Sequence, residues 1–214
     1  MPAATRKPQD HRGNADQHRQ QQMERRLVEA TEHLMNDGTR FTELSVDRLA
    51  TEAGISRASF YLYFEDKGHL LRRLADEAFA DLAAGGKRWW DVAWRHDRAD
   101  VHAAVSGIIA GYRRHQAVLI ALDEASGYDP ATAQAYRDLL GAIIDRVTSV
   151  IQEGQEDGSI RRELPPATTA SALTWMVERT CQQNLPARPP EFDPELASTL
   201  VEVIWGALYL KPVR

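Results

Sequence analysis

The sequence predicts an all-α protein, and three observations support this fold class. Apolar residues recur at steps of three and four in the N-terminal part, and no stretch beyond Gly86 alternates as a half-buried β-strand does. Glycine and proline lie between the periodic stretches, where helices end and begin. The 214 residues, 43% of them hydrophobic, are enough for one large or two small domains with a core.

The first predicted helix follows an aperiodic N-terminal segment. Residues 1–16 are rich in Pro, Gln, Asp, Arg and Gly, which predicts a disordered arm. From Gln17 onward, apolar residues at steps of four, three and four share one helix face, and Gly38 ends this helix. The residues of this face are Met23, Leu27, Ala30 and Leu34.

Three residues that can cap exposed helix amides, Ser45, Ser56 and Asp66, predict three further helices. We therefore expect a helix-turn-helix domain over residues 17–66 and a helical body over residues 67–214. The helices after the first are expected near 46–53, 57–64, 67–85, 101–114, 116–126, 130–156, 166–185 and 194–210.

The stretch from Leu49 to Phe64 has the composition of a tight corner between two helices. Ala50 is small enough for the next helix to cross closely, and Gly54 can adopt the positive φ that a sharp turn requires. Ile55 and Phe60 are expected to fill the angle between the helices. The polar side chains that follow Gly54 are then left near the outer surface.

These outward polar side chains suit DNA. Arg57 can donate two parallel hydrogen bonds to guanine, and Ser59 can contact a base or a phosphate. Tyr61 and Tyr63 carry hydroxyl groups on rigid rings, and Lys67 adds charge where helix amides already favour an anion. The alternative is that the tyrosines only pack the small domain. The candidate DNA-binding residues are Ser45, Arg57, Ser59, Tyr61, Tyr63 and Lys67.

The segment LSVDRLATEAGISRASFYLYFEDKGHLL resembles the DNA-binding domain of the TetR family of repressors, over about residues 20–75. The resemblance rests on the small-residue turn, the Ser-Arg pair, the Phe-Tyr-x-Tyr-Phe cluster and the following lysine. It implies a three-helix DNA-binding head and a helical body, and it implies that the candidates other than Ser45 match DNA-contacting positions of relatives. Gly68-His69 departs from relatives with an acidic residue after the lysine, so we expect a looser first turn there.

The charge balance constrains how DNA can be bound. The net charge is −5, and residues 1–70 carry ten Lys/Arg against eleven Asp/Glu. Neither residues 1–70 nor the rest of the chain is basic overall, unlike most DNA-binding proteins. Phosphate contacts must therefore come from a few local donors, with the acidic residues turned away from the duplex.

The last two predicted helices favour a homodimer. The final helix is apolar nearly all round, so it is expected to be buried on two sides. A two-fold mate would place a second head about one helical turn of DNA (~34–36 Å) away, or a multiple of it. The apolar faces are formed by Leu196, Leu200, Val203 and Ala207, by Val201, Trp205 and Leu208, and in the preceding helix by Leu173, Met176, Val177, Thr180 and Cys181.

The body also indicates a site for a small hydrophobic effector. SALTWMVERT and VEVIWGALY resemble helices of the ethionamide-resistance-regulator-like branch of the family, whose members carry an elongated apolar ligand tunnel. Thr174 and Val177 stand where that branch has asparagines, so the identity of a ligand does not transfer. Candidate lining residues, each of which could instead pack in a core or interface, are Tyr112, Tyr136, Trp175, Met176 and Trp205.

Other function classes find little support. The single cysteine, Cys181, excludes an intramolecular disulfide and is expected to be a buried small hydrophobe. The seven histidines form no HExxH pair, and there is no Gly-x-Ser-x-Gly elbow or phosphate-binding glycine loop, so we expect no enzyme, cofactor or metal site. The first residues contain no apolar run, which predicts a cytoplasmic protein without a membrane segment.

Together these features predict a repressor that binds double-stranded operator DNA as a dimer and is released by a small hydrophobic effector. The alternative is a transcriptional activator, or a regulator controlled by a protein partner. Nothing in the chain distinguishes repression from activation, because that depends on where the operator lies relative to the promoter.

Overall fold

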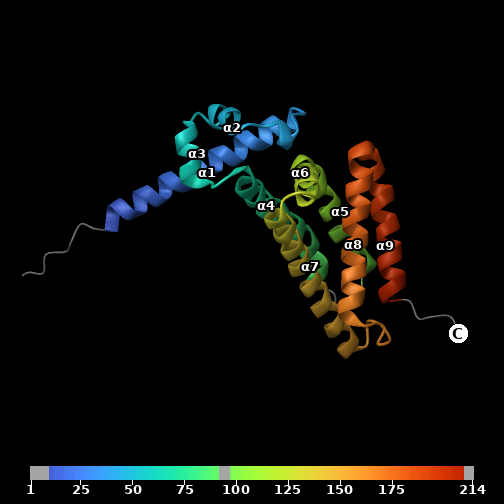
Figure 1. The fold of residues 1–214 in the computed structure, drawn as a ribbon. Helices are drawn as coiled ribbons and strands as arrows, with labels where there is room; N and C mark the ends of the chain where they lie inside the picture. The colour runs from blue at the N-terminus through green and yellow to red at the C-terminus, as the bar shows by residue number, and fades with distance from the viewer. Residues whose placement is uncertain (1–9, 92–96, 210–214) are drawn as a thin grey trace, which may run out of the picture. The chain divides into compact units, whose positions relative to one another are not determined.

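The computed structural model describes residues 10–91 and 97–209, and within these ranges every regular element is a helix (Figure 1). The all-α prediction is confirmed. The chain divides into two compact units, Met1–Arg73, here called the head, and Leu74–Arg214, here called the body. The division lies seven residues beyond the predicted boundary at 66/67, because the start of α4 (Lys67–Trp90) is tied to the head through Lys67.

The head contains α1 (Asp10–Asn36), η1 (Phe41–Glu43), α2 (Val46–Glu52), α3 (Arg57–Tyr63) and the first turns of α4. Helix α1 begins at Asp10, so residues 10–16 are helical and not part of a disordered arm; residues 1–9 lie outside the described residues. The misassigned segment lacks an apolar face, but glutamine and arginine are good helix formers without one.

The predicted caps of the head are confirmed. Ser45 Oγ accepts a hydrogen bond from the amide of Arg48 at 3.1 Å, and Ser56 Oγ accepts one from the amide of Ser59 at 3.0 Å. Asp66 accepts one from the amide of His69 at 2.7 Å, at the start of α4. The side chains that hold α1 to α4 together are fully buried: Leu27, Leu44, Leu49, Phe60, Leu70 and Leu71.

Gly54 makes the corner between α2 and α3. Its φ of +67° lies in the left-handed region that favours glycine, as the sequence predicted. A Cβ atom there would also approach Arg26 Nη2 to 2.7 Å. The corner thus requires glycine for two reasons: the positive φ, and the absence of a Cβ atom that would contact Arg26.

The body is built from the rest of α4 with α5 (Arg98–Arg114), α6 (Gln116–Ser126), α7 (Pro130–Asp157), α8 (Pro166–Asn184) and α9 (Asp193–Leu208). Two short turns, η3 (Leu185–Ala187) and η4 (Pro190–Phe192), join α8 to α9. Helix α7 packs on α8 and α6, and α5 packs on α9. The predicted bounds of these five helices agree with the structure to within about three residues.

Helix α4 does not end at Gly85, as the sequence suggested, but continues to Trp90. The glycine serves a close helix crossing instead of a helix end. A Cβ atom on Gly85 would lie 2.8 Å from the carbonyl carbon of Gly107 in α5, and one on Gly107 would lie 3.1 Å from Gly85 Cα. The two helices can therefore approach backbone to backbone at this point.

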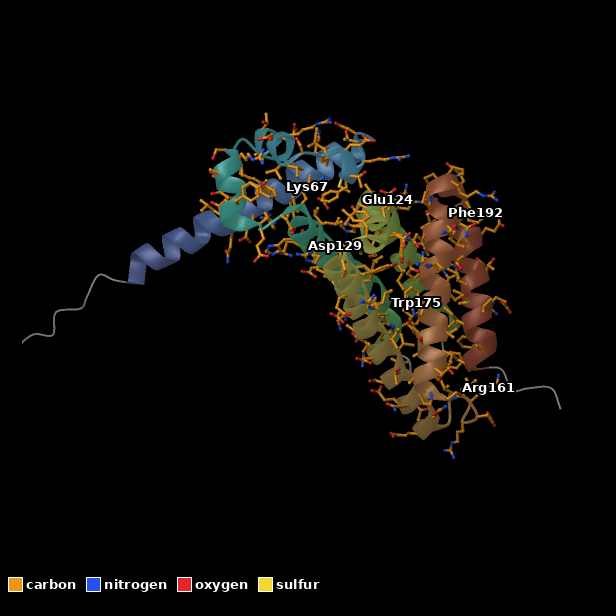
Figure 2. The ribbon with its side chains drawn as sticks, in the orientation of Figure 1. Lys67, Glu124, Asp129, Arg161, Trp175 and Phe192 are labelled. Atoms are coloured by element: carbon orange, nitrogen blue, oxygen red, sulfur yellow. The ribbon has the colours of Figure 1, made fainter. Side chains whose placement is uncertain are left out.

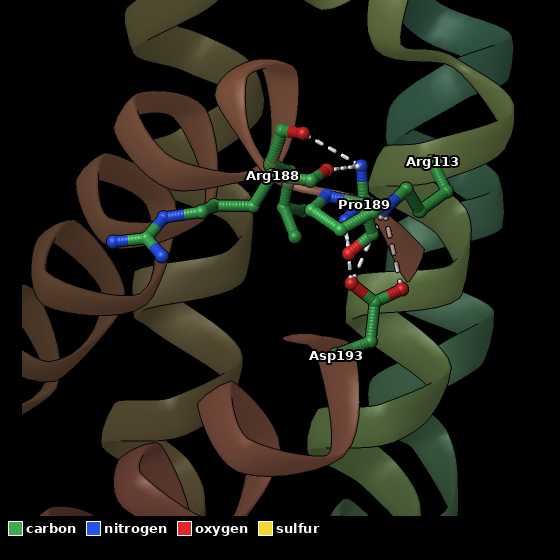
Figure 3. Close-up of polar contacts among 5 residues, drawn as sticks. Arg113, Arg188, Pro189 and Asp193 are labelled. Carbon is green, nitrogen blue, oxygen red and sulfur yellow. Dashed lines mark hydrogen bonds and ion pairs between the residues drawn. The ribbon is translucent and has the colours of Figure 1, made fainter. Parts of the chain in front are cut away.

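Arg113 of α5 holds the connection between α8 and α9 (Figure 3). Its guanidinium donates to the carbonyl oxygens of Leu185, Arg188 and Pro189 at 2.6, 2.9 and 3.2 Å. It also pairs with the carboxylate of Asp193 at 2.6 Å, and both side chains are about one-fifth exposed. One side chain thus satisfies three carbonyls of an irregular segment and the first carboxylate of α9.

Residues 10–91 and 97–209 include no helix with the length and hydropathy needed to cross a bilayer. In the same ranges, no cluster of three or more histidine, cysteine or acidic side chains is arranged to hold a metal ion. Cys181 is fully buried in α8, as predicted.

Candidate DNA-binding surface and ligand cavity

Helix α3 is anchored on one face and open on the other. Phe60 is fully buried and packs edge-on against the ring of Tyr61, with the ring centroids 5.4 Å apart. Arg57 and Tyr61 are exposed, whereas Ser59 and Tyr63 are half-buried. The polar candidates of α3 thus lie on or near the surface of the head, where a groove of DNA can reach them.

The guanidinium of Arg57 has a partner on the neighbouring helix. Its Nη1 lies 2.7 Å from Asp47 Oδ2, and its Cζ lies 5.8 Å from the centroid of the Tyr61 ring. Asp47 and then Tyr61 raise the pKa of Arg57, so the side chain stays charged. Because this pair is exposed to solvent, Arg57 can leave it for another acceptor at little cost.

The two serine candidates take part in local hydrogen bonds. Ser45 caps α2, and the hydroxyl of Ser59 lies 2.8 Å from that of Ser56. A hydroxyl group can donate one bond and accept two, so both residues keep capacity for a further contact.

Lys67 has partners that the sequence did not predict. It lies at the start of α4 (Figure 2), and its ammonium donates to the carbonyl oxygens of Leu44, Phe41 and Thr42 at 2.5, 3.3 and 3.4 Å. Burial lowers the pKa of Lys67. All three donors of the ammonium therefore face carbonyls at η1, and the lysine joins α4 to the head.

Ser45, Tyr61 and Lys67 come together around one shallow hollow of the head. Glu65 and Asp66 line the same hollow, and Asp47 adjoins Arg57. The expectation that acidic residues turn away from the candidate donors is therefore not met at this surface. Any polyanion bound here has to displace or pass these carboxylates.

The body contains an apolar cavity of about 80 Å³. A single water molecule needs roughly 10–15 Å³ of such space, so the cavity can hold a group of several heavy atoms. The lining comes from α4, α5, α7, α8 and α9 and consists of Phe79, Leu82, Trp89, Trp90, Ala104, Val105, Ile108, Tyr112, Leu140, Ile143, Val147, Leu173, Thr174, Val177, Glu178 and Ile204.

Among the five residues predicted to line a cavity, the structure places Tyr112 on its wall. Tyr136 lies behind the wall, with its ring edge-on to Phe79 at 5.9 Å and to Trp175 at 6.4 Å. Trp205 stacks on Tyr209 at 4.4 Å. Trp175 of α8 (Figure 2) and the half-buried Met176 are not among the lining residues.

Sequence reasoning missed most of the wall. Thr174 and Val177 had been noted because they replace asparagines of the similar branch, and Val177 also as part of an apolar face expected at the dimer interface; both line the cavity. That replacement was the available signal, since it marked positions on the cavity side of α8. Phe79, Trp89 and Leu140 carry no comparable signal, because an aromatic or aliphatic residue on an apolar helix face has the same pattern in a filled core.

One carboxylate lies at the cavity wall. Glu178 is 3% exposed, and its Oε1 accepts a hydrogen bond from the Tyr136 hydroxyl. Its Oε2 lies 3.4 Å from Arg179 Nε. Burial raises the pKa of Glu178, while the bond from Tyr136 and the charge of Arg179 act in the opposite direction.

Two family models match the chain. One, for bacterial regulatory proteins of the tetR family, covers residues 27–74, and the other, for the C-terminal domain of the transcriptional regulator EthR, covers residues 101–210. The second model spans more than half of the 214 residues. The chain belongs to the TetR family of transcriptional regulators. Its resemblance to the EthR branch, inferred from α8 and α9, is confirmed.

Curated relatives agree with this assignment. The HTH-type transcriptional regulator EthR of Mycolicibacterium smegmatis is 29% identical over 185 residues, which cover 84% of this chain and 83% of the relative. EthR of Mycobacterium tuberculosis is 26% identical, with 86% and 85% covered. This TetR-family member is therefore a helix-turn-helix transcriptional regulator, and the enzyme alternative is excluded.

Solved structures show the same fold. The fatty acid degradation regulator FadR from Bacillus halodurans superposes with a TM-score of 0.71 at 14% identity, over 86% of this chain and 95% of that one. FadR from Bacillus subtilis, solved in complex with stearoyl-CoA, has a TM-score of 0.66 at 14% identity, with 84% and 96% covered.

Proposed function

We propose that this TetR-family regulator is a cytoplasmic repressor that binds operator DNA as a homodimer and is released by a small apolar molecule. The observation that carries the proposal is the apolar cavity in the body of a chain whose head presents a helix-turn-helix. The complex of Bacillus subtilis FadR with stearoyl-CoA supports a ligand-binding body in this fold.

In the DNA complex, α3 enters the major groove. Arg57 leaves Asp47 and donates to a base, because its guanidinium is exposed and charged. Ser59, Tyr61 and Tyr63 contact phosphates or base edges with their hydroxyl groups. Ser45 lines the adjoining hollow and contacts the DNA backbone at the edge of the groove. Lys67 lines the same hollow and reaches a phosphate there by giving up one of its three carbonyl partners.

The dimer forms through α8 and α9. Each of these helices packs one face on its own body, α8 on α7 and α9 on α5. Val203 of α9 remains 47% exposed, and Trp175, Met176 and Trp205 remain half-buried. Apolar residues that stay exposed on two consecutive helices are typical of a surface that a second subunit covers.

Release follows from differential affinity. A ligand that binds more tightly to an arrangement of the two heads that does not fit the operator shifts the population toward that arrangement. A coupling of ~1–3 kcal/mol weakens DNA binding roughly 5–150-fold, which is enough to relieve repression.

A gel-shift assay tests the proposal with DNA that flanks the coding sequence of the protein. We expect a retarded complex of two chains per operator, weakened by at least one of three probes: octylamine, 1-octanol or octanoate. Indifference to every duplex at low salt contradicts the proposal. Transcript levels after deletion of the gene distinguish repression from activation. Loss of a repressor should raise the target transcript, and loss of an activator should lower it.

A further inference from the structure

The ligand cavity has one polar corner, formed by Thr174 and Glu178 of α8. Both residues line the cavity, and each has a buried oxygen, Thr174 Oγ1 and Glu178 Oε2, without a hydrogen-bond partner among the described residues. Residues four positions apart lie on the same face of a helix. The two oxygens therefore belong to the same part of an otherwise apolar wall.

The unpaired hydroxyl of Thr174 is unlike those of several other helical threonines in this chain. Threonine inside a helix commonly satisfies its hydroxyl by donating to the carbonyl oxygen four residues earlier. Four residues do so here, at 2.7 to 3.0 Å: Thr31, Thr51, Thr148 and Thr199. Thr174 makes no such bond, so its hydroxyl keeps unused hydrogen-bonding capacity at the cavity wall.

The carboxylate of Glu178 is held as an acceptor. The Tyr136 hydroxyl donates to Oε1, and Arg179 Nε lies 3.4 Å from Oε2 without forming a hydrogen bond to it. Burial raises the pKa of Glu178, and both neighbours oppose this effect, because one donates to the ionised form and the other carries a positive charge. A buried acceptor with an open position costs stability unless a donor reaches it.

The wall around this corner is aromatic. Phe79, Trp89, Trp90 and Tyr112 line the same cavity. The faces of such rings attract a cation and tolerate a neutral alkyl chain equally well. The ring faces carry no positive charge that would offset a second carboxylate beside Glu178.

We propose that the molecule bound in this cavity is apolar with a hydrogen-bond-donating head, an amine or an alcohol, whose donor is accepted by Glu178 and Thr174. A carboxylate ligand has acceptors only and would bring a second negative charge to the corner. This inference rests on the proposed function, because it names the chemistry of the molecule that enters the same cavity.

Calorimetric titration of the full chain with octylamine, 1-octanol and octanoate tests the inference. These probes share one alkyl chain and differ only in the head group. We expect octylamine or 1-octanol to bind roughly 10-fold more tightly than octanoate, as one hydrogen bond to a charged group predicts. If octylamine binds more tightly than 1-octanol, the head group of the natural ligand is a cationic donor; if 1-octanol binds more tightly, it is a neutral donor.

Two substitutions locate the contact. Glu178→Gln keeps an acceptor oxygen for Tyr136 but removes the charge, and we expect it to reduce the preference over octanoate to about 3-fold or less. Thr174→Val preserves shape, and we expect it to weaken 1-octanol binding while raising the Tm of the ligand-free protein. Glu195→Gln, at an exposed position on α9 outside the cavity, is the control and is expected to change neither.

Several outcomes overturn the inference. They are octanoate binding as tightly as the other two probes, a head-group preference that survives Glu178→Gln in a folded variant, and no binding of any probe. Octanoate that binds best and still releases DNA overturns the inference alone and leaves the proposed function standing. A protein that binds octylamine selectively but no duplex overturns the proposed function alone.

Discussion

The polar groups of the head and of the body differ in their exposure and in whether they have hydrogen-bond partners. In the head, the candidate DNA contacts are at or near the surface and already have partners, Arg57 with Asp47 and Lys67 with three carbonyls. In the cavity of the body, Thr174 Oγ1 and Glu178 Oε2 are buried and lack a hydrogen-bond partner. An exposed pair such as Arg57 and Asp47 can exchange partners at little cost, whereas a buried atom without a hydrogen-bond partner favours a molecule that supplies one.

The largest effect is expected in the core of the head. Phe60→Ala removes a ring that is 0% exposed, which should lower the free energy of unfolding of the head by about 3–5 kcal/mol. Chemical denaturation followed by circular dichroism measures this loss. Leu62→Ala, at a side chain that is 76% exposed, is the control and should stay within about 0.5 kcal/mol. Loss of probe binding to the body in Phe60→Ala would show that the two units do not fold separately.

The next effect is expected in the body. Arg113→Met leaves Asp193 and three carbonyls without their donor, and we expect a loss of about 3 kcal/mol, near the low end for breaking a buried ion pair. The neighbouring Arg114→Met breaks a surface pair with Asp81 and should cost less than about 1 kcal/mol. Thermal unfolding of the two variants compares them, and equal losses would contradict the assigned role of Arg113.

A third comparison tests whether the exposed pair of the head limits DNA binding. Arg57→Ala should lower operator affinity roughly 10-fold and relax base preference, with helicity unchanged. Asp47→Asn should raise affinity a few-fold, because it removes the competing carboxylate from Arg57. Fluorescence anisotropy with the operator and a scrambled duplex measures both. Unchanged base preference in Arg57→Ala would mean that Arg57 is misassigned.

The smallest effect concerns pH, and two carboxylates of the body should behave oppositely. The hydrogen bond from Arg114 is the main cause that lowers the pKa of Asp81 below 3.8, so its contribution to stability is present above that pH and is lost as pH falls through the folded-state pKa. Burial raises the pKa of Glu178 above 4.5, so stability falls as pH rises through that range. Asp81→Asn and Glu178→Gln should each remove one of these slopes from the pH dependence of unfolding.

Local features were predicted well because their causes are local. Ser45, Ser56 and Asp66 cap helices because of hydrogen bonds to amides three residues away, and Gly54 turns the chain through its own φ. Gly85 misled the prediction of where α4 ends, because the reason for a glycine at this position lies in another helix. Gly85 allows Gly107 of α5 to approach closely. The carbonyl partners of Lys67 were not predicted, for the same reason, since they are more than twenty residues away.

The sequence by itself determined the all-α fold and the helix-turn-helix, since periodicity, caps and a tight corner are properties of neighbouring residues. The family followed from the resemblance of the segment around Gly54 to known relatives. Only the tertiary structure decided which residues line the cavity and which polar atoms within it lack a partner. The physical reason is that a cavity is defined by what several helices leave unfilled. Tyr112 lies on that wall and Trp205 does not, although both are large rings on apolar helices.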